Sequence, residues 1–316
     1  MPKSKKQHLA RIKVLGVGGG GSNAITRMYD NFPRSIELVA INTDIQDLEH
    51  CEAKKKICIG KNLTKGLGTG MNPDLGRQAA EESRSEIAEV LRDADLVFLA
   101  LPHTLSMETV PRVLKHGVRL VDLSADFRLH DADTYRTWYK TEPAQARLLK
   151  EAVYGLPEAH RAAVVKANLV ANPGCYPTSG LLALLPLLKD RSLRTDRIII
   201  DAKSGVSGAG RSPGDRTHFP EANESLQAYA LTGHRHLPEI DQEATERAGK
   251  KIGVTFIPHL IPMNRGILST VYLEFTTKTS AEAIRKSFAA FYKGAPFVRL
   301  VENGGSPNVS AVRGSN

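Results

Sequence analysis

The sequence predicts an α/β fold: a Rossmann-like parallel sheet domain, followed by an α+β catalytic and dimerisation domain. Strand-like and helix-like segments alternate through the first 125 residues or so, which is typical of a doubly wound sheet. Continuous apolar runs such as "DLVFLAL" at 95–101 are expected of buried parallel strands. The 316 residues suit two domains, and an apolar content of 41% is enough for two cores.

The first domain is expected to span residues 1–160. Its predicted strands are 12–17, 36–44, a short strand within 51–60, 95–101 and 118–124. Its predicted helices are 22–32, 73–94 and 107–117, with Pro73 near the start of the second and Gly117 ending the third. A glycine-rich loop at 62–76 separates the short strand from the long helix.

The second domain is expected to span residues 161–316, where the regular alternation of strand-like and helix-like segments ends. The segment 167–188 combines a strand, a tight turn and an apolar helix. The segments 196–210, 251–263 and 267–277 are rich in β-forming residues and indicate a mixed or antiparallel sheet. A late helix at 279–294 has Thr279 or Ser280 as its N-cap.

The composition restricts the possible functions. No stretch approaches 18 apolar residues, and "MPKSKKQHLARIK" lacks the apolar core of a secretory signal, so we expect a cytoplasmic protein without membrane association. The net charge of +9 is spread along the chain without interleaved aromatics, which favours phosphorylated small molecules over nucleic acid as partners. Three cysteines are too few for a disulfide framework or a four-ligand zinc site.

The first glycine cluster, in "IKVLGVGGGGSNA", lies between a predicted strand and a helix. Gly16, Gly18 and Gly21 fit the G-x-G-x-x-G pattern of a phosphate-binding turn. Asp44 follows the second strand, where a carboxylate accepts hydrogen bonds from a ribose 2′-hydroxyl, as in NAD sites, and repels the 2′-phosphate of NADP. Lysines 54–56 are available to offset that repulsion. Equally, "INTD" can belong to a site that binds no dinucleotide.

The turn "NPGCYPT" places Cys175 just before an apolar helix. Unpaired N–H groups at a helix N-terminus favour a thiolate and can also stabilise an oxyanion on a carbonyl under attack. The alternative is a buried structural cysteine. The prolines and the glycine around this tight turn favour a functional cysteine.

Two further segments supply partners for a nucleophilic thiol. "TGHRHLPEIDQ" concentrates His234, Arg235, His236 and Glu239, and a histidine distant in sequence is the base that such a thiol needs. A surface turn is the alternative, and no third ligand supports a metal site. The glycine- and serine-rich loop 202–215 contains Arg211 and resembles a phosphate or cofactor loop. Together these features indicate acyl-phosphate chemistry through a thioester, followed by hydride transfer from a nicotinamide.

From about residue 95 to the end, the sequence resembles the N-acetyl-γ-glutamyl-phosphate reductases of arginine biosynthesis, relatives of aspartate-semialdehyde dehydrogenase. The motifs that carry the resemblance are "LPHTLSMETVP", "VDLSADFRL", "AVYGLPE", "LVANPGCYPT", "DAKSGVSGAGR", "GHRHLPEI" and "PHLIPMNRGILSTVY". The resemblance implies that Cys175 is the nucleophile and His234 the general acid/base. It also implies NADP as cofactor (NAD is possible), a homo-oligomer formed through the second domain, and a family chain that continues several tens of residues beyond "VRGSN".

The same resemblance implies two sets of binding residues. The residues that orient substrate are Arg128, Arg211, His236, Glu239 and Arg265. The residues near the nicotinamide are Pro102, His103, Ser207 and Gly208.

Residues 11–98 resemble instead the N-terminal part of the cell-division GTPase FtsZ. The motifs are the first glycine loop, "ELVAINTDIQDL", "GLGTGMNP" with the helix after it, and "ADLVF". The resemblance implies that the loop residues Gly18, Gly19, Gly20, Gly21, Ser22 and Asn23 contact nucleotide phosphates, with GTP as an alternative ligand. The sequence therefore predicts a fusion of an FtsZ-like segment with a reductase-like segment. Residues 99–160, within the first domain, belong to the reductase-like part.

The fusion leaves three functions open. "LPHTLSM" stands where the GTPase family has its second phosphate loop, so GTP hydrolysis is not expected. The leading hypothesis is an NAD(P)H-dependent reductase of N-acetyl-γ-glutamyl phosphate. The alternatives are a GTP-binding module without hydrolysis and a composite chain with neither activity.

Overall fold

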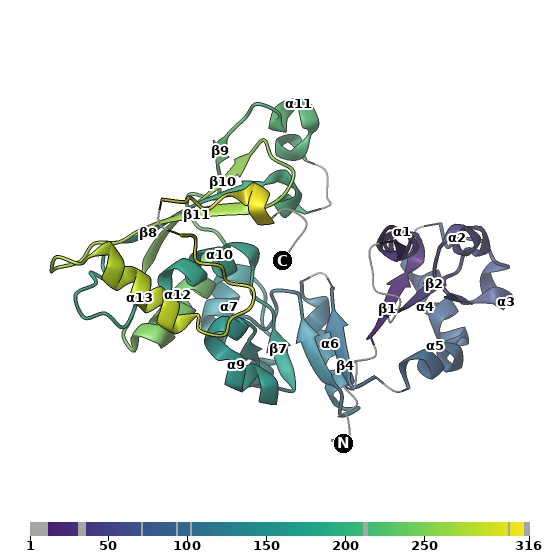
Figure 1. Ribbon diagram of the computed structural model, residues 1–316. Helices are drawn as coiled ribbons and strands as arrows, with labels where there is room; N and C mark the ends of the chain where they lie inside the picture. The colour runs from purple at the N-terminus through teal and green to yellow at the C-terminus, as the bar shows by residue number, and fades with distance from the viewer. Residues whose placement is uncertain are drawn as a thin grey trace, which may run out of the picture. The chain divides into compact units, whose positions relative to one another are not determined.

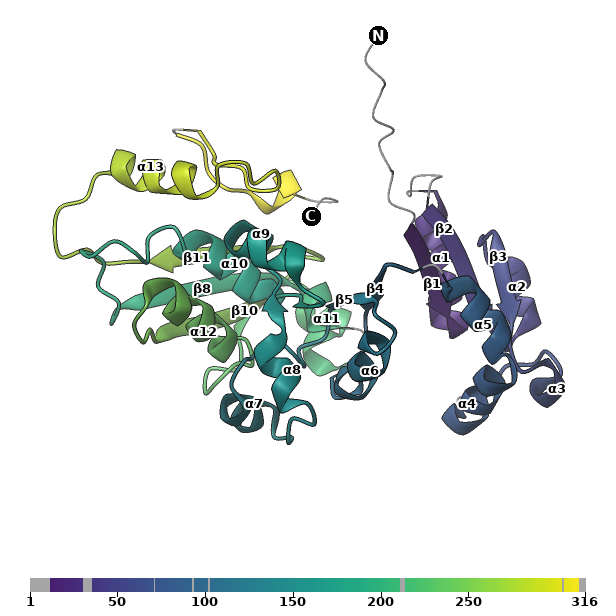
Figure 2. The same ribbon diagram turned by 90° about the horizontal axis from the view of Figure 1, so that it is seen from below.

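The computed structural model describes residues 12–30, 36–70, 72–92, 94–101, 103–210, 214–302 and 304–312. The chain forms two compact units, Met1–Ala94 and Asp95–Asn316 (Figures 1 and 2). The α/β fold class is confirmed, since helices alternate with parallel strands in both units. The units divide close to the predicted crossover at 98–99, and the division into domains at residue 160 stays a prediction. No helix of the described residues is long and apolar enough to cross a membrane.

The first unit is built on a three-stranded parallel sheet in the order β1-β2-β3. Its central strand β2 presents Leu38 and Ala40 to one core and Val39 and Ile41 to another, because side chains alternate along a strand. The elements are β1 (Ile12–Val17), α1 (Gly18–Tyr29), β2 (Ile36–Asn42), α2 (Ile45–His50), β3 (Lys55–Cys58), α3 (Lys61–Thr64), α4 (Pro73–Glu82) and α5 (Arg84–Leu91).

The predicted helix at 73–94 is two helices, α4 and α5, separated at Ser83. Ser83 has φ −100° and ψ 21°, outside the helical region. Its hydroxyl accepts a hydrogen bond from the N–H of Gly60 at 3.1 Å, which ties the break to the segment after β3. This tertiary contact overrides the continuous helical pattern of the sequence.

The second unit begins with a four-stranded parallel sheet in the order β4-β5-β7-β6. Its core joins strands and helices through Val110, Leu120, Phe127 and Leu149, all fully buried. The elements are β4 (Leu96–Leu99), α6 (Leu105–Leu114), β5 (Arg119–Asp122), α7 (Ala132–Tyr139), α8 (Ala146–Glu151), β6 (Val153–Tyr154), α9 (Pro157–Lys166) and β7 (Leu169–Ala171).

A second sheet follows in the order β11-β8-β10-β9, with β8 and β10 parallel and the outer pairs antiparallel, so the predicted mixed sheet is confirmed. One face packs Ile198, Ile200 and Phe256 with leucines of α10. The elements are α10 (Cys175–Leu184), β8 (Ile198–Gly205), η1 (Val206–Ala209), η2 (Asp215–Thr217), α11 (Phe219–Ala222), β9 (Gln227–Ala228), α12 (Leu237–Ala248), β10 (Val254–Ile261), β11 (Ile267–Tyr272), α13 (Ala281–Phe291) and η3 (Val309–Val312). Ser280 is the N-cap of α13.

Candidate active site

Three loops of the second unit meet because they leave the carboxyl ends of neighbouring parallel strands, the edge at which such sheets carry their sites. They follow β4, β5 and β7, and the third leads into α10. Asp126 ties the first two loops together by accepting the N–H groups of Thr104 at 3.0 Å and Met107 at 3.2 Å. The N–H of Asn172, at the start of the third loop, donates to the carbonyl of Asp122.

Cys175 is the first residue of α10, as the sequence predicts, and its side chain is exposed. The neighbouring protein nevertheless displaces enough water to raise the pKa of its thiol. The N–H groups of Tyr176 and of Cys175 itself lower that pKa, as does Arg128, but by less. The net direction is opposite to the thiolate-favouring effect expected of a helix N-terminus.

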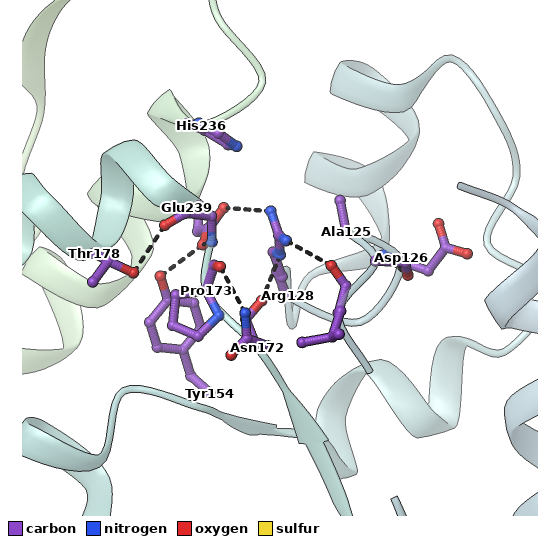
Figure 3. Close-up of polar contacts among 12 residues, drawn as sticks. Ala125, Asp126, Arg128, Tyr154, Asn172, Pro173, Thr178, His236 and Glu239 are labelled. Carbon is purple, nitrogen blue, oxygen red and sulfur yellow. Dashed lines mark hydrogen bonds and ion pairs between the residues drawn. The ribbon is translucent and has the colours of Figure 1, made fainter. Parts of the chain in front are cut away.

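The turn before Cys175 is held by a buried ion pair of Arg128 and Glu239 (Figure 3). Arg128 donates to the carbonyl of Asn172 at 2.7 Å and to that of Leu123 at 3.1 Å. Glu239 accepts the N–H of Gly174 at 2.7 Å, and its other carboxylate oxygen lies 3.6 Å from the guanidinium of Arg128. The exposed fractions are 8% for Arg128 and 1% for Glu239.

His234 and His236 both pack against the ring of Tyr176, the residue after Cys175. The ring centroids lie 5.7 Å and 6.0 Å from that of Tyr176. A Cβ placed on Gly174 would lie 2.6 Å from Nε2 of His236, so this histidine is seated directly on the turn. The structure therefore brings both predicted histidines to the segment that contains Cys175.

Both histidines are neutral over the physiological range. Burial, and next the charge of Arg235, lowers the pKa of His234 to about 4, and burial with its histidine neighbour lowers that of His236 to about 2. Nδ1 of His234 accepts the backbone N–H of His236 at 3.1 Å. A neutral ring that accepts at Nδ1 has its proton on Nε2, so His234 presents a donor with its other nitrogen.

The other predicted residues of the second unit lie in two places. Ser207 and Gly208 form η1, where the N–H of Ser207 donates to the carbonyl of Asn264, next to the exposed Arg265. His103 accepts the N–H of Ala125 at 3.3 Å, and burial lowers its pKa. Pro102 and Arg211 lie outside the described residues.

Three tyrosines of the site were missed from the sequence. Tyr154 donates to Glu239 at 2.7 Å. Tyr229 donates to the hydroxyl of Tyr176, which donates to the carbonyl of His259. Tyr154 and Tyr176 stand inside the motifs "AVYGLPE" and "NPGCYPT", but neither motif indicates where the hydroxyl points.

The predicted phosphate turn of the first unit lies between β1 and α1. Gly18 has φ +69° and open space where a Cβ would be, and α1 starts there. A Cβ on Gly16 would lie 2.4 Å from the carbonyl oxygen of Gly21, so both positions require glycine for close strand–helix packing. Ser22 is buried and donates to the carbonyl of Gly18.

The other residues around this turn are exposed or acidic. Gly19, Gly20 and Asn23 are exposed. Asp44 is the N-cap of α2 and accepts the N–H groups of Gln46 and Asp47, so one of its carboxylate oxygens is already engaged. Among the described residues, no group of three or more His, Cys, Asp or Glu side chains is placed to hold a metal ion.

Comparison with known proteins gives two matches to family models. Residues 175–316 match the semialdehyde dehydrogenase dimerisation domain, and residues 11–102 match the GTPase domain of the tubulin/FtsZ family. An N-acetyl-gamma-glutamyl-phosphate reductase of Pelotomaculum thermopropionicum is 50% identical over 307 residues, covering 97% of this chain and 83% of the relative. The chain belongs to the N-acetyl-γ-glutamyl-phosphate reductase family. Both resemblances predicted from the sequence are thus confirmed.

Other members of the reductase family give similar values. The enzyme of Geobacter sulfurreducens is 47% identical and covers 84% of this chain, which spans 78% of that relative. The enzyme of Magnetococcus marinus is 51% identical over 71% of this chain and 64% of its own length. The crystal structure of aspartate semialdehyde dehydrogenase II from Vibrio cholerae shares the fold, with a TM-score of 0.51 and 15% identity, covering 87% of this chain and 78% of that one.

Proposed function

We propose that this chain reduces N-acetyl-γ-glutamyl phosphate to N-acetylglutamate semialdehyde in arginine biosynthesis, with Cys175 as the nucleophile. The observation that carries the proposal is an accessible thiol at the start of α10, on a turn fixed by a buried ion pair and flanked by two neutral histidines. The proposed substrate is taken from the relatives, which are named N-acetyl-gamma-glutamyl-phosphate reductase.

In the first step, the Cys175 thiolate attacks the acyl carbon, and the bond to the phosphate oxygen breaks so that phosphate leaves with the electron pair. The oxyanion that forms is placed to accept from the N–H groups of Cys175 and Tyr176. These are the donors of the first turn, because Pro177 has no N–H and the N–H of Thr178 already bonds to Gly174.

We assign His234 the role of hydrogen-bond donor to the same oxygen. This role replaces the general base predicted from the sequence, because the proton of the ring is on Nε2 and its unprotonated Nδ1 is engaged by the N–H of His236. We therefore propose that the thiol proton of Cys175 goes to solvent. A bound nicotinamide would supply hydride to the thioester carbon. The C–S bond would then break, so that Cys175 would regain its thiolate and the aldehyde would form without a proton from the protein.

For the cofactor, we propose a nicotinamide dinucleotide at the glycine turn of the first unit. The positive φ of Gly18 and the glycine-lined strand–helix contact at the start of α1 suit a pyrophosphate. Asp44 is an acidic group with one engaged oxygen, which suits a ribose hydroxyl better than the 2′-phosphate. NAD is therefore the better fit to these residues, although the family implies NADP.

The second candidate ligand of this turn is GTP, favoured by the match of residues 11–102 to the tubulin/FtsZ family. Titration with a fluorescent GTP analogue tests it, with NADH and NADPH as competitors. Displacement by either dinucleotide supports one shared site. No change in fluorescence with millimolar protein excludes GTP binding, and binding of neither ligand would leave a composite chain without a nucleotide site.

We also propose that two copies associate through the outer face of the sheet β11-β8-β10-β9. Leu268, Lys203 and His259 are aligned across the strands on this face, and Tyr272 and Ile199 form a second row. Asp201 pairs with Lys203 at 2.5 Å and His259 at 3.1 Å, so the centre of the face carries both charges and complements a second copy of itself. Ile199, Leu268 and Tyr272 surround this centre with 39%, 40% and 54% of their surfaces exposed.

Light scattering tests the association. We expect a dimer for the wild type and a monomer for Tyr272→Arg. The control Val165→Arg, at a more exposed apolar position on α9, keeps the wild-type mass. A dimeric Tyr272→Arg variant would refute association through this face.

The predicted cytoplasmic location and the predicted substrate contacts of Arg211 and Arg265 stay predictions.

The reductase itself is tested by the reverse reaction. N-acetylglutamate semialdehyde, phosphate and NAD+ or NADP+ are supplied, and the reduced cofactor is measured for the wild type and Cys175→Ser. We expect turnover by the wild type alone, with a lower KM for NAD+ than for NADP+. No turnover by the wild type at saturating concentrations of both cofactors would refute the proposal.

A further inference from the structure

Glu239 is an almost fully buried ionisable group beside the turn that contains Cys175. It lies in the first turn of α12, its exposed fraction is 1%, and its carboxylate faces the turn before α10 (Figure 3). One oxygen accepts two hydrogen bonds, from the N–H of Gly174 and the hydroxyl of Tyr154, both at 2.7 Å. A carboxylate so enclosed has no surface left for a substrate.

The contact to Gly174 fixes the Pro173–Gly174 peptide group, the second one before the nucleophile. Gly174 is the N-cap of α10 and has no side chain with which to cap the helix. Its φ of −67° and ψ of 156° are held from outside, by a carboxylate 65 residues further along the chain. The position of Cys175 therefore depends on α12.

Arg128 holds the other side of the same turn. It donates to the carbonyl of Asn172, two residues before Gly174, and faces the second oxygen of Glu239. The cation thus binds a carbonyl and the anion binds an N–H, each matching the peptide dipole that it meets. The pair fixes two of the three peptide groups that precede Cys175.

The charges of the pair act on the thiol in opposite directions. Arg128 lowers the pKa of Cys175 and Glu239 raises it. Glu239 therefore opposes formation of the thiolate while it orders the turn. A residue that activates the thiol would lower its pKa. Glu239 raises that pKa, so its contribution to the site is the hydrogen bond that holds the turn.

We propose that Glu239 is a positioning residue for Cys175, acting through the N–H of Gly174, and not a group that binds substrate. The inference rests on the proposed role of Cys175 as nucleophile. It adds that the turn must be ordered for the thiol to attack the acyl carbon, and that Tyr154 supports the carboxylate in this task.

The test compares Glu239→Gln, Glu239→Ala and Tyr154→Phe with Glu243→Gln as matched control. Glu243 lies one turn further along α12, is equally buried, and binds His160 instead of the cysteine turn. Two readouts are used: kcat and KM in the reductase assay, and the pH profile of Cys175 alkylation by iodoacetamide without substrate. Cys175→Ser identifies the alkylation that belongs to this thiol.

We expect Glu239→Gln to lower kcat on the order of 10- to 100-fold with little change in KM, because misplacement of an attacking atom by about 1 Å has that effect. The alkylation profile shifts to lower pH, because a negative charge that raises the pKa of the thiol is removed. Tyr154→Phe lowers kcat by less, and Glu243→Gln leaves both readouts unchanged.

The opposite results overturn the proposal. A higher KM with wild-type kcat and an unchanged alkylation profile would show that Glu239 contacts substrate. If Glu239→Ala fails to fold, Glu239→Gln and Tyr154→Phe still decide the question. Alkylation needs no turnover, so a wild type without reductase activity refutes the proposed function and leaves this test intact.

Discussion

Replacing Arg128 by Met should destabilise the second unit strongly, because it leaves the charge of Glu239 buried without a partner. Arg128 also makes hydrogen bonds to the carbonyls of Asn172 and Leu123, which Met cannot replace. Removing one partner of a buried ion pair costs about 3 to 5 kcal/mol, and we expect a loss of that size in the free energy of unfolding. Arg128→Met combined with Glu239→Gln should recover part of it, because the buried charge is then absent.

The loss should depend on pH with a defined sign. Burial already raises the pKa of Glu239 above its ordinary value of 4.5, and Arg128 is the largest influence that lowers it. Without Arg128 the folded protein binds this proton more tightly than the unfolded chain does. Stability is then lost as the pH rises above 4.5 through the folded pKa and is regained as the pH falls. The double variant should lack this dependence.

Urea unfolding followed by tryptophan fluorescence measures the effect, since Trp138 on α7 is the only tryptophan of the sequence and belongs to the second unit. The matched control is Arg136→Met, which removes ion pairs to Asp133 and Glu142 at the surface, where solvent screens such pairs. The measurements are made near pH 8 and near pH 5.5. The reasoning is refuted if Arg128→Met loses no more stability than Arg136→Met, or the same amount at both pH values.

Three further predictions test other parts of the structure. His234, whose pKa burial lowers to about 4, should remain neutral with its proton on Nε2 at pH 5.5, and a ¹⁵N spectrum showing a charged ring or a proton on Nδ1 would contradict the assigned donor role. Gly16→Ala should destabilise the first unit by about 1 to 3 kcal/mol, because the new Cβ would clash with Gly21 and Ile25. The control Gly76→Ala, in open space on α4, should not destabilise it. Hydrogen exchange of β1 and β2 measures the difference. The alkylation rate of Cys175 should still be rising at pH values above the ordinary thiol pKa, and a plateau at neutral pH would show that the helix N-terminus outweighs the loss of water.

The sequence predicted those elements whose signal is local. Apolar runs located the parallel strands, and "NPGCYPT" located the strand, turn and helix around Cys175. The prediction that "DLVFLAL" is buried was wrong, because β4 leaves Leu96 and Phe98 exposed by 45% and 61%. The break at Ser83 was missed because it depends on the N–H of Gly60, 23 residues away, which no local pattern encodes. Element type follows from neighbours in sequence, whereas a break of this kind follows from neighbours in space.

The candidate site shows the same division. Cys175, the two histidines, Arg128 and Glu239 were identified as a set, and the structure places each of them at or beside one turn. Which group each one touches was not predictable. Glu239 meets Gly174 across 65 residues, and Arg128 meets Asn172 across 44. The pKa of Cys175 likewise depends on the water displaced by the assembled loops, so its direction could not be read from a helix N-terminus alone.

The two glycine turns of the chain explain why the chemistry belongs to the second unit. Gly18 opens α1 with a positive φ and free space where a Cβ would be. Gly174 opens α10 with His236 and Arg128 where a Cβ would be, and its N–H is bound by Glu239. The open space at Gly18 suits the binding of a charged ligand. The packed surroundings of Gly174 suit a side chain, that of Cys175, which must keep one position. A replaced nucleotide turn can therefore change which cofactor the chain accepts without disturbing the turn that positions Cys175.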